Sequence, residues 1–135
     1  MLKKEITYVD YNGVERTETF YFNFTQTELT EFEASFPGGM SARMQEISAA
    51  KDMPAMMKFF RQIILSAYGE KSADGRRIIK SEELSKAFSE TPAYDILCQE
   101  IFMGNGMVNF LTGILPAELA EKIRPEMNKL LESGK

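Results

Sequence analysis

The 135-residue sequence contains no histidine and no tryptophan, and it has a single cysteine, Cys98. Without histidine the chain lacks the usual general base, the commonest metal ligand and the Ser–His and Cys–His pairs that activate nucleophiles. One cysteine cannot form a disulfide within the chain. Because Cys98 lies among apolar residues, we interpret it as a small buried side chain in a reducing compartment rather than a reactive thiol.

Carboxylates are the remaining groups that could perform acid–base chemistry or hold a metal. Adjacent acidic residues such as Glu82 and Glu83 lie at predicted helix starts, where helix capping and the helix dipole account for them. The Asp74-Gly75 turn lacks the alternating acidic ligands of an EF-hand loop. We therefore predict no enzyme activity, no cofactor and no metal site.

Long apolar runs are also missing. No stretch of about 18 uninterrupted apolar residues occurs, and the first ten residues lack the apolar region of a secretion signal. The hydrophobic share of 44% and the charged share of 27% are ordinary for a globular protein. We expect a single domain over residues 1–135 that stays in the cytoplasm and does not bind a membrane.

The charge is unevenly distributed around a formal net value of −4. Residues 36–80 carry eight basic and four acidic side chains, whereas both flanking segments are acidic. This central basic segment either contacts the acidic ends of its own chain or binds an acidic partner. Nucleic acid is disfavoured, because the chain is acidic overall and its basic residues are not interleaved with stacking aromatics.

The first 24 residues predict a β-hairpin around Asn12-Gly13. A two-residue turn there would place Ile6 and Tyr8 opposite threonines. A three-residue loop with Gly13 in the left-handed conformation would instead put them on one face with Phe20, Phe22 and Phe24, and we favour this register. That aromatic face must rest on helices of the same chain or on another subunit, because an isolated hairpin is only marginally stable.

Residues 25–132 predict a bundle of five to seven short helices, followed by a flexible tail at residues 133–135. The central helix is expected to begin at the cap Asp52 and to stop at Gly69 in a left-handed conformation. Residues 70–75 are predicted as a turn, after which Ile78 and Ile79 form a brief strand or pin the loop to the core. Further caps are expected at Thr25, Ser81 and Thr91, and a break near Pro125. The predicted fold class is thus α+β and predominantly helical, with the hairpin packed on the helices.

Two features suggest how such a protein would bind a partner. Five of the nine methionines lie between residues 40 and 57, where they either fill gaps in the core or offer an adaptable surface. Residues 107–115 form a strongly apolar patch, which is a second candidate surface if it is exposed, as is the aromatic face of the hairpin. The basic turn after Gly75 is either a contact site or a structural clasp. The candidate partner-binding residues are Met56, Met57, Met107, Phe110, Leu111, Ile114, Arg76 and Arg77.

Two stretches resemble the tail assembly chaperones of long-tailed, siphovirus-type bacteriophages and prophages. One is EITYVDYNGVERTETFYFNFTQTELTEFE (residues 5–33), which has the Tyr-Asp-Tyr-Asn-Gly hairpin and the acidic helix with which that family commonly begins. The other is FFRQIILSAYGEKSADGRRIIKSEELSKAFSETPAYDIL (residues 59–97), which is similar to the same family around its Ala-Tyr-Gly and Asp-Gly-Arg-Arg segments.

This resemblance implies a chaperone in the host cytoplasm that is absent from the mature virion. It would bind the tape measure protein, a long and largely helical chain that sets tail length, and keep it soluble until tail tube subunits polymerise around it. The tail tube protein and a second copy of the chain are further candidate partners. The alternative is a helical adaptor or virion connector without chaperone activity.

Overall fold

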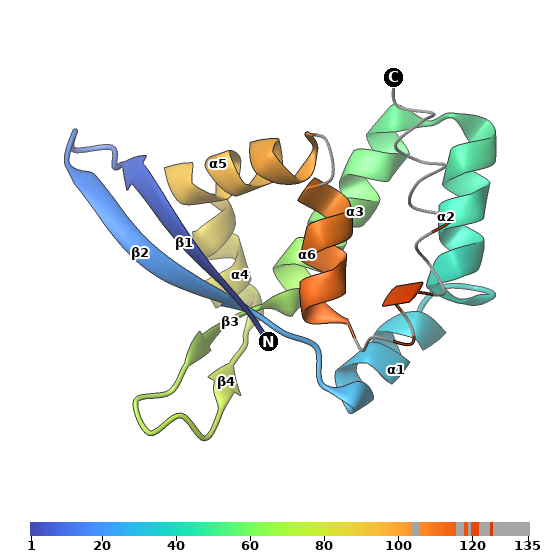
Figure 1. Cartoon of the computed structure of the whole chain (residues 1–135), viewed down its shortest axis with the longest axis horizontal. Helices are drawn as coiled ribbons and strands as arrows, with labels where there is room; N and C mark the ends of the chain where they lie inside the picture. The colour runs from blue at the N-terminus through green and yellow to red at the C-terminus, as the bar shows by residue number, and fades with distance from the viewer. Residues whose placement is uncertain (104–105, 116–117, 119, 122–124, 126–135) are drawn as a thin grey trace.

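The structure is a computed structural model, and it describes residues 1–103, 106–115, 118, 120–121 and 125 (Figure 1). The described chain forms an antiparallel sheet and a group of helices, which confirms the predicted α+β, mainly helical fold class. The predicted helices of residues 116–132, the break near Pro125 and the tail at 133–135 lie outside the described residues, apart from a few isolated positions. The elements are β1 (Leu2–Val9), β2 (Glu15–Phe22), α1 (Gln26–Ala34), α2 (Gly39–Ala50), α3 (Met53–Ala67), β3 (Tyr68–Lys71), β4 (Ile78–Ile79), α4 (Glu82–Ser89), α5 (Pro92–Ile101) and α6 (Gly106–Ile114).

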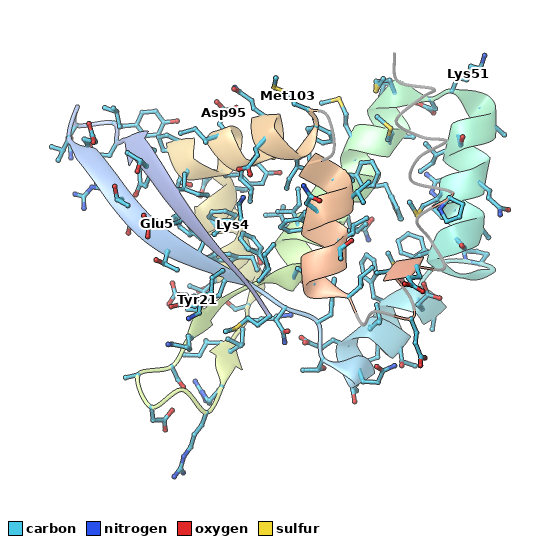
Figure 2. The ribbon with its side chains drawn as sticks, in the orientation of Figure 1. Lys4, Glu5, Tyr21, Lys51, Asp95 and Met103 are labelled. Atoms are coloured by element: carbon cyan, nitrogen blue, oxygen red, sulfur yellow. The ribbon has the colours of Figure 1, made fainter. Side chains whose placement is uncertain are left out.

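Strands β1 and β2 form the predicted hairpin with the three-residue loop. The backbone N–H of Asp10 donates to the carbonyl of Val14 at 2.9 Å, and Gly13 has a φ of 80°. In this register Ile6 lies on the same face as Phe22, and both are buried. Lys4 lies on the side of the hairpin that faces the helices, and Glu5 lies on the opposite, exposed side (Figure 2). The aromatic face therefore packs on helices of the same chain.

The sheet has four strands in the order β1-β2-β3-β4, so it extends beyond the predicted hairpin. Strand β3 follows α3 directly and pairs with β2 through Tyr21↔Gly69. This corrects the prediction of a left-handed helix stop at Gly69 and of a turn from residue 70. Gly69 is needed for close packing instead, because a Cβ there would collide with the side chain of Ile78. The brief strand at Ile78–Ile79 is confirmed.

The predicted helix caps are all present. The Thr25 hydroxyl accepts a hydrogen bond from the backbone N–H of Glu28, and the Glu28 carboxylate accepts one from the backbone N–H of Thr25. Helix α1 therefore begins with a capping box. Asp52 accepts from the Ala55 N–H at 3.0 Å at the start of α3. Ser81 and Thr91 act in the same way at the starts of α4 and α5.

Aromatic side chains from distant segments meet in the core between the sheet and the helices. The rings of Tyr68 and Phe88 stack with centroids 4.2 Å apart, and Phe22 makes an edge contact with Phe110 at 5.2 Å. Helix α6 lies in the middle of the molecule in the view of Figure 1, between the hairpin and α3. The core thus joins the sheet, the central helix and α6 in one contiguous cluster.

Candidate partner-binding surface

Helix α3 has one buried face and one exposed face. Phe60, Ile63 and Ile64 point into the core and are at most 2% exposed. Met53 and Met57, near the start of α3, are 40% and 44% exposed, although methionine is an apolar residue that folding would normally bury. The exposed face of α3 therefore combines apolar side chains with charged ones.

Two hollows follow this exposed face. The first has a volume of about 580 Å³ and is lined by α3 residues alone among the described residues. The second, of about 490 Å³, lies between α3 and the start of α4. Because both are lined by Gln62 and Leu65, they adjoin and form one depression, which we call the α3 trough. Its residues are Pro54, Met57, Lys58, Arg61, Gln62, Leu65 and Ser66 on α3, with Tyr68, Lys80, Ser81, Glu82 and Ser85 beyond it.

Hydrogen bonds fix the walls of the trough. The Ser85 hydroxyl donates to the Leu65 carbonyl at 2.9 Å and thereby ties α4 to α3. Nε of Arg61 donates to the Tyr94 hydroxyl at 3.0 Å. This hydrogen bond raises the pKa of Arg61 above its ordinary value, so the guanidinium remains charged at the edge of the trough. The trough thus presents an apolar floor with fixed positive charge.

The neighbouring polar side chains of α5 are not prepared for catalysis. Burial raises the pKa of the Tyr94 hydroxyl, and burial likewise raises the pKa of the Cys98 thiol. Cys98 is half-buried and stays protonated at neutral pH, so it is a poor nucleophile. Among the described residues, no group of three or more cysteine, aspartate or glutamate side chains could hold a metal ion.

The structure divides the predicted site residues between the surface and the core. Met57 lies in the trough, and Met56 is half-buried against the core. Arg76 and Arg77 are exposed on the loop between β3 and β4 and line a different hollow. Of the predicted partner-binding residues, the trough contains only Met57. Its other side chains were not selected from the sequence.

The apolar patch at residues 107–115 is buried in α6 and the residue that follows it, so it is not the exposed surface that was considered from the sequence. Its predicted contact residues are at most 3% exposed, because α6 lies inside the molecule and packs against β1. Gly113 allows this approach, since a Cβ there would lie 2.9 Å from Cδ1 of Leu2. In this conformation the side chains are core residues and are inaccessible to a partner: Met107, Phe110, Leu111 and Ile114.

The trough residues that sequence reasoning missed carried a weak signal. Lys58, Arg61 and Gln62 fall between the core positions of α3, a pattern that indicates only a solvated face. The useful signal was the pair Met53 and Met57, two methionines four residues apart near the start of the helix. Exposed apolar side chains within a polar face are the feature that distinguishes a binding surface from a solvated one.

Comparison with known proteins gives one result. A family model described as phage tail assembly chaperone matches residues 1–133 of the chain. No curated protein and no solved structure matches it. Within the part of the chain that the structure describes, no helix is both long and apolar enough to span a bilayer.

Proposed function

The chain belongs to the phage tail assembly chaperones, and on this premise we propose that it binds the tape measure protein and keeps it soluble while the tail tube assembles. Membership of a chaperone family indicates a non-enzymatic role that consists of binding phage tail proteins. The observation that supports the proposal best is the α3 trough, because it leaves Met57 44% exposed beside the charged side chains of Lys58 and Arg61.

The size of the trough fits a helical client. Helix α3 has 15 residues and is therefore about 22 Å long. The depression follows this helix from Pro54 to Ser66. A client helix of about four turns, lying along α3, would cover the trough in the helix-in-groove mode. The tape measure protein, as a long and largely helical chain, would offer many such segments.

The side chains of the trough suit clients of variable sequence. Methionine is flexible and polarisable, so Met57 and its neighbour Met53 adapt to client side chains of different shapes. Lys58 and Arg61 would pair with acidic residues that flank the apolar stripe of the client. Binding in this way requires an amphipathic helix but no particular sequence.

A chaperone of this kind must also release its client. A single shallow trough gives modest affinity. The entropy that the side chains of both partners lose on binding offsets much of the free energy gained by burying apolar surface. Several copies bound along one tape measure protein would hold it through avidity, and each copy could leave as the tube advances.

Co-expression with the tape measure protein from the same phage genome tests the proposal. We expect the client to be largely insoluble alone, soluble with the wild-type chain, and insoluble again with Met57→Asp, since a charge would then lie on the apolar floor of the trough. The measurement is the soluble fraction of the client after centrifugation.

Val14→Asp is the matched control for this experiment. Val14 is 52% exposed, comparable to Met57, but it lies at the hairpin tip, which projects away from α3 (Figure 1). This variant should keep the client soluble. Equal client solubility with and without the wild-type chain would contradict the proposed function, and equal loss with both variants would contradict the assignment to the trough.

We place the protein in the host cytoplasm and outside the mature virion. A chaperone that leaves as the tail tube forms is absent from finished particles, whereas an adaptor or connector remains in them. Mass spectrometry of purified particles distinguishes the two, because a stoichiometric amount of this chain in the virion would favour the connector.

A further inference from the structure

The loop between β3 and β4 is ordered by its own hydrogen bonds, although it does not contribute to the core. Figure 1 shows this hairpin projecting from the body of the molecule. The Ser72 hydroxyl donates to the Asp74 carboxylate at 2.7 Å, and the same carboxylate accepts from the Arg76 N–H at 3.0 Å. The Arg77 N–H donates to the Ser72 hydroxyl at 3.1 Å. These hydrogen bonds fix the backbone that carries the two arginines.

Within the described part of the chain, both guanidinium groups lack an acidic partner. Among the described residues, neither Arg76 nor Arg77 forms an ion pair, and both residues are exposed. They line a hollow of about 360 Å³ together with Lys71 and Lys80. Four basic side chains therefore surround one small depression in a protein whose formal net charge is −4.

The hollow already binds a carboxylate of its own chain. Nζ of Lys80 lies 2.9 Å from Oε2 of Glu28, and it also donates to the carbonyls of Asn23 and Ser66. Burial raises the pKa of the Glu28 carboxyl, but the hydrogen bonds from Thr25 and Lys80 outweigh that effect and hold the pKa below its usual value. Glu28 is thus ionised and neutralised by Lys80, which leaves the other three basic groups uncompensated.

We infer that this hollow, which we call the basic hollow, is a docking site for an acidic segment of a partner protein. It adjoins the α3 trough at Lys80, which lines both, but Arg76, Arg77 and Lys71 line the basic hollow only. Arginine held on a fixed backbone is suited to binding carboxylates in a two-pronged geometry. The volume admits a few carboxylate side chains and is too small for a helix. Nζ of Lys71 lies 5.5 Å from the centroid of the Tyr21 ring, and this packing positions the ammonium group at the hollow.

A short acidic protein segment fits this site better than a nucleic acid. Among the described residues no aromatic side chain lines the hollow, and Lys71 covers the nearby ring of Tyr21, so bases of a nucleic acid would find no stacking platform. The ionised Glu28 and the net negative charge of the chain also oppose a polyanion. A short acidic stretch needs contact only at the hollow itself.

Fluorescence anisotropy with a labelled peptide of alternating glutamate and serine tests this inference on the full chain. We expect the wild-type protein to bind this peptide and not the same peptide with glutamine in place of glutamate. Arg76→Glu combined with Arg77→Glu should weaken binding at least about tenfold, since two attractive charges become repulsive. Circular dichroism checks that the variant is folded.

Lys51→Glu combined with Lys86→Glu is the matched control, because it changes the net charge equally. Figure 2 shows Lys51 at the opposite end of the molecule from the basic hollow. This control and Met57→Asp should bind the peptide within about twofold of wild type. The Met57→Asp result separates this inference from the proposed function, which depends on the trough.

Four results would overturn the inference. The first is that the glutamine peptide binds as tightly as the glutamate peptide. The second is that the Lys51 and Lys86 control loses as much affinity for the glutamate peptide as the arginine double variant does. The third is tighter binding of a single-stranded oligothymidine, which would identify nucleic acid as the occupant. The fourth is a concentration-dependent larger species in sedimentation that the arginine double variant abolishes, which would identify a second copy of the chain.

Discussion

Helices α3 and α6 are both strongly apolar, but the molecule uses them in opposite ways. Helix α6 contains no charged residue, and its large side chains lie in the core. Helix α3 carries Lys58 and Arg61 at the surface and also leaves Met53 and Met57 exposed. The more apolar helix is therefore part of the scaffold, and the less apolar one offers the accessible surface.

The reason for this difference is general. A helix with a wide apolar face is stable only when other elements cover that face. A helix with a polar face can remain at the surface, and apolar side chains within that face are not required by folding. Overall hydrophobicity thus pointed to a buried helix, and exposed methionine in a charged setting is what selects α3 as the candidate surface.

The largest difference in stability between the two helices should appear when an aspartate is introduced into each of them. Leu111→Asp in α6 buries a carboxylate without a partner at a position with no exposure, so we expect a loss of about 4 kcal/mol or more in the free energy of unfolding. Met57→Asp should change it by less than about 0.5 kcal/mol. Urea denaturation followed by circular dichroism measures both, and similar losses would remove the distinction between the helices.

A smaller difference in the free energy of unfolding is expected when a methionine is replaced by alanine on each helix. Met107 is 1% exposed, so Met107→Ala should lower the free energy of unfolding by about 2–5 kcal/mol through a cavity in the core. Met57→Ala should cost less than about 0.5 kcal/mol. A large loss for Met57→Ala in thermal or urea denaturation would mean that Met57 belongs to the packed core.

The smallest effect concerns the approach of α6 to the sheet. In Gly113→Ala the new methyl group presses on the end of the partly buried Leu2 side chain, while the higher helix propensity of alanine stabilises α6 by up to about 1 kcal/mol. We expect a net change below about 1 kcal/mol in the free energy of unfolding. A loss above about 2 kcal/mol would show that Leu2 cannot move and that α6 is held more tightly than its contacts indicate.

The local signals in the sequence predicted much of the fold correctly. Caps such as Thr25 and Asp52 act through hydrogen bonds within one turn of the helix, so they can be read from a few neighbouring residues. The hairpin register followed in the same way from Asn12-Gly13 and the alternation of side chains around it. These features depend on residues that are close in the chain.

Strand β3 and the position of α6 depend on contacts that are distant in the chain. Gly69 and Lys71 have the composition of a turn, but pairing with Tyr21 makes their segment a strand. Likewise, nothing within residues 107–115 shows whether another element covers them. For the candidate site, the sequence identified Met57 but not the adjoining wall from α4, because that wall exists only after α4 packs on α3.

The direct junction between α3 and β3 has a mechanical consequence. The helix ends at Ala67 and the strand begins at Tyr68, so no linker separates them. Tilting the helix would therefore strain the ladder between β2 and β3, and the backbone beneath the trough behaves as a stiff rod. If the trough binds clients as proposed, accommodation of differently shaped clients falls to rotamer changes of Met57, which occur within nanoseconds and need no hinge.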